Sequence, residues 1–167
     1  MKTTKIRKLF HRPVAVVMAA LLAFGGIAGL ASADDVQGPV TVGAGEHKTI
    51  NGGIICIDSS SQVALLVDAS DGEVGAKDAS VTVKGNIEMS SDETGSLNHY
   101  AVFVQEKDGH ASAEVEGDVT LTDLNSFANT YGLYTATQTA GVQTPPSIHV
   151  TGKLKVKGLN PGVRTFF

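Results

Sequence analysis

The chain has very little of the chemistry that marks several large protein classes. It has one cysteine, Cys56, and no tryptophan in 167 residues, and only seven aromatic residues follow residue 33. A single cysteine excludes an internal disulfide framework and a cysteine-rich metal site. So few aromatic rings argue against a large stacking platform. Beyond residue 33, Arg164 is the only arginine.

Basic side chains are also missing from most of the chain. Of the 13 lysines and arginines, five lie before Pro13, whereas all 17 acidic residues lie from Asp34 onward. Residues 34–167 therefore hold 8 basic and 17 acidic side chains, a net charge of −9. This balance argues against a nucleic-acid partner, which needs a basic face, and against docking on anionic lipid.

The N-terminal segment is typical of a signal peptide. A basic stretch, 1–12, precedes an apolar run, 14–30, which is followed by the small residues Ala31-Ser32-Ala33. We expect cleavage between Ala33 and Asp34, so that residues 1–33 are removed. The mature module, 34–167, is then secreted or displayed at the cell surface without inserting into the membrane. An uncleaved anchor is the alternative, because the apolar run of 17 residues is at the lower limit for spanning a bilayer.

Short β-branched stretches and frequent glycine indicate an all-β module. Sixteen glycines lie in residues 34–167, and no window shows a sustained helical period. One pattern, hydrophobic-x-Gly-x-hydrophobic-x-hydrophobic, recurs with its glycine at Gly38, Gly85, Gly117 and Gly152, and more loosely over 50–56. A second pattern, bulky-small-hydrophobic-hydrophobic after a polar residue, recurs over 62–67, 99–104 and 130–135.

The order and spacing of the two patterns predict a stacked repeat. Each later copy of the glycine pattern follows a copy of the second pattern, at a period near 33 residues. Strands without helices cannot bury their apolar faces alone, so equivalent strands should pair in parallel between copies. We expect a right-handed parallel β-helix, a solenoid of about four rungs, with Cys56 buried. An antiparallel sandwich is the competing fold.

The expected rung also predicts which side chains meet. Val119 and its equivalents in the other glycine patterns should point inward. Lys84 should lie beside Glu116 and Asp118 beside Lys153 on the outer surface. The basic edge formed by Lys153, Lys155 and Lys157 should abut a further rung.

The repeat resembles the passenger region of bacterial autotransporters, as in pertactin-like β-helix adhesins. The residues that carry this resemblance are segments such as 113–121, preceded by 100–104 and an Asp108-Gly109 turn. The resemblance covers about 36–158. It implies a surface β-helix, often an adhesin, followed in its parent chain by more rungs and a C-terminal outer-membrane barrel. Since the sequence up to Phe167 contains no barrel, we expect either the N-terminal part of a longer passenger or a short free-standing relative.

No constellation for catalysis or for a cofactor emerges from the residues. The histidines His47, His99, His110 and His149 form no zinc-binding spacing and are interpreted as exposed. The acidic turn Asp68–Glu73 matches no calcium loop, and calcium binding there stays open. Glu88 and Glu116, the one pair of carboxylates worth weighing for glycoside chemistry, are interpreted as surface charges.

These observations predict a non-enzymatic adhesion or surface-interaction module with a host or cell-surface ligand. A carbohydrate-active β-helix enzyme of the polysaccharide lyase or hydrolase kind, or a truncated relative of one, is the first alternative. A structural surface repeat protein is the second.

Overall fold

The computed structural model describes residues 34–57, 61–70, 77–91, 97–107, 109–123, 129–138, 144–158 and 161–166. The expected signal peptide, residues 1–33, and part of the acidic turn lie outside these ranges. Within the described ranges every regular element is a β-strand. None of these residues belongs to a helix that could cross a membrane.

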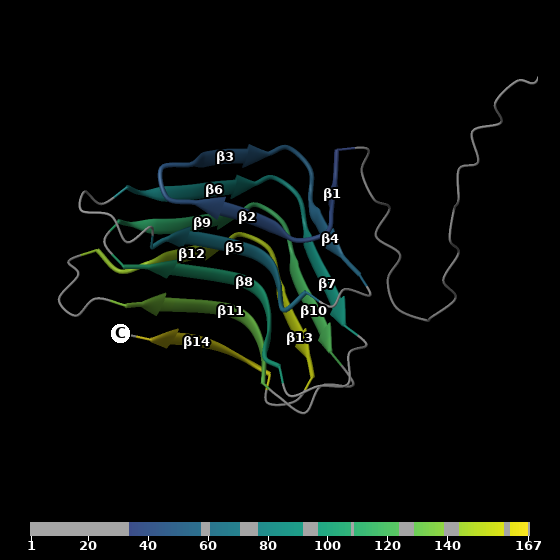
Figure 1. Cartoon of the computed structure of the whole chain (residues 1–167). Coiled ribbons are helices and arrows are strands. Elements are labelled where there is room, and N and C mark those ends of the chain that lie inside the picture. The colour runs from purple at the N-terminus through teal and green to yellow at the C-terminus, as the bar shows by residue number, and fades with distance from the viewer. Residues whose placement is uncertain are drawn as a thin grey trace, which may run out of the picture.

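The strands form three sheets, named A, B and C here (Figure 1). Sheet A contains β1 (Val36–Gln37), β4 (Ile54–Cys56), β7 (Ile87–Ser91), β10 (Val119–Asp123) and β13 (Leu154–Lys157). Sheet B contains β2 (Val40–Gly43), β5 (Val63–Ala69), β8 (His99–Glu106), β11 (Thr130–Thr137) and β14 (Gly162–Phe166). Sheet C contains β3 (His47–Ile50), β6 (Ala79–Val83), β9 (Ala111–Val115) and β12 (Ser147–Val150).

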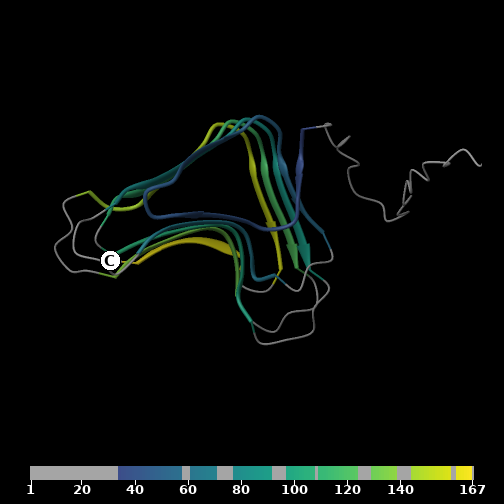
Figure 2. The same ribbon diagram turned by 45° about the horizontal axis from the view of Figure 1, so that its top comes forward.

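Consecutive strands pass from sheet A to B to C and back to A, and each strand pairs with its equivalents in the neighbouring turns. Every pairing is parallel. Viewed closer to the coil axis, the three sheets form the sides of a triangle (Figure 2). The molecule is therefore a parallel β-helix of four full rungs, with β13 and β14 beginning a fifth, and the antiparallel sandwich is excluded.

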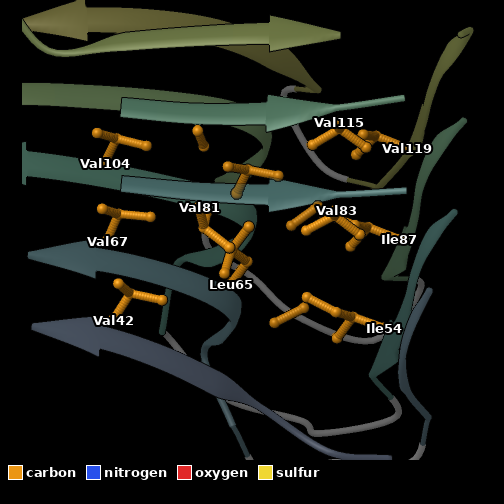
Figure 3. Close-up of a cluster of buried hydrophobic side chains, with 14 of the residues drawn as sticks. Val42, Ile54, Leu65, Val67, Val81, Val83, Ile87, Val104, Val115 and Val119 are labelled. Atoms are coloured by element: carbon orange, nitrogen blue, oxygen red, sulfur yellow. The ribbon is translucent and has the colours of Figure 1, made fainter. Parts of the chain in front are cut away.

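Side chains that alternate inward along the strands fill the triangle (Figure 3). Val119 pairs with Ile87 on one side and Leu154 on the other, and the first two are fully buried. Cys56 is buried in the same core, as predicted. The inward residues of the glycine patterns at Gly85 and Gly117 are confirmed as core: Val83, Ile87, Met89, Val115, Val119 and Leu121.

A column of glycines forms the tight corner between sheets C and A. A Cβ on Gly117 would lie 2.6 Å from the carbonyl carbon and oxygen of Gly85, and one on Gly152 would lie 2.5 Å from the carbonyl carbon of Gly117. No side chain fits between backbones stacked this closely. The column also includes Gly52, from the looser copy of the pattern over 50–56.

Gly38 does not belong to this column, contrary to the alignment expected from sequence. Val36, which precedes it, pairs with Ile54, so this copy of the pattern is shifted relative to the others. Gly38 lies between β1 and β2, at the corner from sheet A to sheet B. Its φ of +90° explains the glycine, because this left-handed conformation is costly for other residues.

Polar side chains next to the glycine column connect one rung to the next. The Asn86 side-chain oxygen accepts a hydrogen bond from the Asp118 N–H at 2.9 Å, and Asp118 accepts one from the Lys153 N–H at 2.8 Å. These bonds satisfy corner amides that no strand ladder reaches. The expected neighbourhood of Asp118 and Lys153 is confirmed, but the ammonium group near Asp118 is that of Lys155, at 3.5 Å.

Candidate functional site

Four aromatic rings gather on the outer face of sheet B, where β8 and β11 pair. Tyr100 lies opposite Tyr131, and Phe103 lies opposite Tyr134. The ring centroids of Tyr100 and Phe103 are 5.1 Å apart, and those of Tyr100 and Tyr131 are 5.4 Å apart, both in stacked arrangements. Tyr134 meets the rings of Tyr100 and Phe103 edge-on, at 4.9 Å from each. We call Tyr100, Phe103, Tyr131 and Tyr134 the aromatic cluster.

Arg164 of β14 extends the aromatic cluster toward the C-terminal end. Its guanidinium donates a hydrogen bond of 2.9 Å to the Tyr131 hydroxyl and lies 6.0 Å from the centre of that ring. Tyr131 is buried by these neighbours, whereas Tyr100, Phe103 and Tyr134 are half-buried. Partial burial raises the pKa of the Tyr134 hydroxyl, so it is a neutral hydrogen-bonding group at physiological pH.

Amide side chains border the aromatic cluster on the side where β8 and β11 begin. The Asn98 amide donates to the Tyr100 hydroxyl at 3.2 Å. The Asn98 side-chain oxygen in turn accepts from the Asn129 N–H at 3.1 Å. The same kind of amide thus repeats in two adjacent rungs, and the border presents uncharged donors and acceptors.

The other border of the aromatic cluster includes Asp68, the first residue of the acidic turn. One Asp68 oxygen accepts a hydrogen bond of 2.7 Å from Gln105. The other accepts bonds from the N–H and the hydroxyl of Ser70. Protein donors thus engage both oxygens, and residues 71–73 lie outside the described ranges. Across the described ranges, no group of three or more His, Cys, Asp or Glu side chains is placed to hold a metal ion.

A buried polar cluster lies at the corner from sheet A to sheet B. The His99 Nδ1 atom is 2.5 Å from an Asp123 oxygen, and its Nε2 atom is 3.5 Å from the Ser91 hydroxyl. His99 is 1% exposed, so the sequence-based expectation of an exposed histidine is wrong here. Ser91 and Asp123 pair across β7 and β10, which explains how residues so far apart in sequence meet.

The order Ser91, His99, Asp123 is that of a nucleophile, a base and an orienting carboxylate. All three side chains point into the solenoid, with exposed fractions of 7%, 1% and 1%. A nucleophile must reach its substrate, and burial of this depth favours a different role. The hydrogen bonds hold the end of sheet A against the start of sheet B and satisfy polar atoms that water does not reach.

Glu106 is a second buried ionisable group, at the end of β8. Its side chain is fully buried, and one carboxylate oxygen lies 3.7 Å from His110 Nδ1, beyond hydrogen-bonding distance. The other oxygen accepts a bond of 3.4 Å from the Thr137 hydroxyl. Burial raises the pKa of the Glu106 carboxyl.

We therefore expect Glu106→Gln to stabilise the protein at neutral pH by about 1 kcal/mol. Because the pKa of Glu106 is raised in the folded state, the wild-type protein has its full free energy of unfolding below the ordinary carboxyl pKa of 4.5, where the side chain is neutral. This contribution to the free energy of unfolding is lost as the pH rises through the folded-state pKa. Glutamine is uncharged throughout, so the gain over the wild-type protein should grow from pH 4 to pH 8. Urea unfolding across this range measures it. Glu114→Gln, on the exposed side of β9, is the control, and an equal pH dependence of both variants would contradict the assignment.

The remaining residues considered from sequence are dispersed. His47 is exposed, with its Nδ1 atom 2.7 Å from the Ser80 hydroxyl, and His149 lies outward on β12. Glu88 lies on sheet A opposite Thr120, whereas Glu116 follows β9 in sheet C. Glu88 therefore lies on a face of the triangle, whereas Glu116 lies at the corner between sheets C and A, one residue after β9.

Sequence reasoning missed the aromatic cluster, although a signal for it was present. The small number of aromatic residues argued against a stacking platform, yet four of the seven in 34–167 occupy this one face. Tyr100 and Tyr131 occupy the same position of the second repeat pattern, as do Phe103 and Tyr134. Stacking two copies in register was enough to bring the rings together.

Comparisons with known protein families, with curated proteins and with solved structures find no match to this chain. The parallel β-helix rests on the strand pairing itself, and the aromatic cluster rests on the register of β8 against β11.

Proposed function

We propose that this protein is a secreted or surface-displayed, non-enzymatic β-helical module that attaches to a partner surface through the aromatic cluster on sheet B. The observation that carries the proposal is the concentration of four rings and Arg164 over β8, β11 and β14, in a module with few aromatic residues elsewhere. Tyrosine and arginine are the residues that most often dominate binding energy at protein interfaces.

The packing of the aromatic cluster suits it to binding. Its rings are held by one another and by the sheet below, so little side-chain freedom is lost when a partner covers them. The amides at the border, Asn98 and Gln105, offer hydrogen bonds in the directions that the rings leave open. The rings stand on β8 and β11, and each of these strands pairs with a neighbour on both sides.

The fold supports an adhesive role by its shape. A solenoid of paired parallel strands presents one flat side over several rungs. The repeat pattern resembles autotransporter passengers, and a passenger-type adhesin would use such a side at the cell surface. The expected signal peptide supports export, which an adhesive role requires.

Replacing Tyr134 by Ser should reduce attachment at least fivefold, because it removes a half-buried ring from the middle of the aromatic cluster. Beads coated with the mature protein would be applied to mucin-coated plates and to epithelial cell monolayers, and retained beads counted under flow. Thr120→Ser, on the outer face of sheet A, is the control, and circular dichroism establishes that both variants are folded.

Two results would contradict the proposal. One is equal attachment of the Tyr134 variant and the wild-type protein. The other is attachment of wild-type beads at the level of albumin-coated beads on both surfaces.

A further inference from the structure

The chain has three tyrosines, and all of them lie in the aromatic cluster. Tyr100 is on β8, whereas Tyr131 and Tyr134 are on β11 in the next rung. The ring centroid of Tyr100 is 5.4 Å from that of Tyr131 and 4.9 Å from that of Tyr134, and the two rings on β11 are 5.3 Å apart. At these separations the rings touch. Strand pairing thus holds together three phenols that the sequence keeps apart.

Residues 34–167 contain few other side chains that oxidants attack readily. They include no tryptophan, and their single cysteine and single methionine, Cys56 and Met89, are 1% and 2% exposed in the core. Because the oxidation of sulfur depends on exposure, both are protected in the folded protein. Tyr100 and Tyr134 are only half-buried. An oxidant that meets the folded protein therefore reaches these two phenols before it reaches sulfur.

Two phenols in contact can be coupled by a one-electron oxidant. Loss of one electron and the hydroxyl proton from each tyrosine gives two phenoxyl radicals, whose unpaired spin is shared with the ring carbons ortho to the oxygen. Two such carbons form a C–C bond, and the hydrogen on each coupled carbon then moves to its oxygen and restores the phenol. One hydrogen peroxide takes up the two electrons and two protons and becomes two molecules of water. The cross-linked chain is lighter by two hydrogen atoms.

We propose that the aromatic cluster is an oxidative cross-linking site, at which a haem peroxidase using hydrogen peroxide joins Tyr100 to Tyr134 as dityrosine and so links β8 covalently to β11. Among the three tyrosine pairs this one has the closest centroids, at 4.9 Å. Its two members are also the half-buried ones, whereas Tyr131 is 7% exposed and accepts a hydrogen bond from Arg164. The reaction involves rings to which the proposed function assigns attachment, but it does not depend on a partner.

The bond would strengthen the solenoid beneath the aromatic cluster. A covalent link within one chain restricts the unfolded state more than the folded state, as a disulfide does. The link between Tyr100 and Tyr134 closes a loop that contains a whole rung. The melting temperature of the cross-linked monomer should therefore rise by about 5 °C or more. An unchanged melting temperature would overturn the proposed linking of the two rungs.

Treatment of the mature protein with a haem peroxidase and hydrogen peroxide tests the proposal. The monomer should gain the fluorescence of dityrosine and lose the mass of two hydrogen atoms. Trypsin separates Tyr100 from both tyrosines of β11, because Lys107 lies between them. The proposed bond should therefore leave two tryptic peptides joined, whereas a bond within β11 would join none.

Replacement by phenylalanine identifies the two partners, since it keeps a ring but has no hydroxyl hydrogen to lose. Tyr100→Phe and Tyr134→Phe should each lower the yield of joined peptides at least tenfold. Phenylalanine fits at position 134, because Phe103 occupies the same register position in the preceding rung. Tyr131→Phe is the comparison and should keep at least half of the yield. Circular dichroism establishes that the variants are folded, and if Tyr100→Phe is not, Tyr134→Phe and the peptide map decide.

Several results would overturn the proposal. They are a monomer without dityrosine, a bond confined to β11, and equal yields from Tyr131→Phe and Tyr134→Phe. The yield in each chain should also stay constant on tenfold dilution, because both rings belong to one molecule, and a yield that falls on dilution would assign the bond to pairs of chains instead. Cross-linking is measured without mucin or cells, so its failure and the failure of attachment are separate results.

Discussion

Replacing Val119 by Asp should lower the free energy of unfolding by about 3 kcal/mol or more. Val119 is fully buried on β10, between Ile87 and Leu154 of the adjoining strands. A carboxylate there would have apolar neighbours in both directions and no partner for its charge. Urea unfolding at neutral pH, followed by circular dichroism, measures the loss.

The neighbouring residue provides the matched control. Thr120 lies on the same strand but points outward, opposite Glu88 and Lys155. Thr120→Asp should change the free energy of unfolding by no more than about 0.5 kcal/mol. Equal losses for the two variants would mean that β10 does not present alternate faces to core and solvent, and the solenoid register would be wrong.

A methyl group on Gly117 should destabilise the protein by about 2 kcal/mol or more. In Gly117→Ala the new Cβ would lie 2.6 Å from the Gly85 carbonyl and 2.5 Å from the Asn86 side-chain oxygen. The Gly85 atoms belong to the backbone of the previous rung, which can move only if the stacking of the whole corner loosens. The strain should therefore affect both adjacent rungs.

Gly162→Ala is the comparison for this second variant. No atom lies within 4 Å of the Cβ that it would add, so the same chemical change should cost little. Thermal unfolding of the two variants under identical conditions separates crowding at the corner from the general effect of replacing glycine. A melting temperature of Gly117→Ala equal to that of Gly162→Ala would refute the close stacking of the glycine column.

The sequence alone was sufficient to predict the fold, because equivalent residues of each rung make equivalent contacts. These contacts therefore require the same residue pattern to recur along the chain. The glycines at 85, 117 and 152 recur because one corner brings backbones too close for any side chain. The apolar residues around Gly117 alternate because alternate side chains of β9 and β10 fill the triangle. In the second pattern the small residue is followed by another buried residue. In β8, for example, Ala101 and Val102 are both buried.

Only the tertiary structure could decide the features that depend on how two copies meet. His99 reads as an ordinary polar residue until β7 and β10 place Ser91 and Asp123 beside it. The aromatic cluster arises from rings about thirty residues apart, and their scarcity in the composition concealed their concentration on one face. Gly38 lies in a copy of the glycine pattern but at the corner between sheets A and B. The pattern alone does not distinguish a glycine required by a left-handed turn from one required by closely stacked backbones.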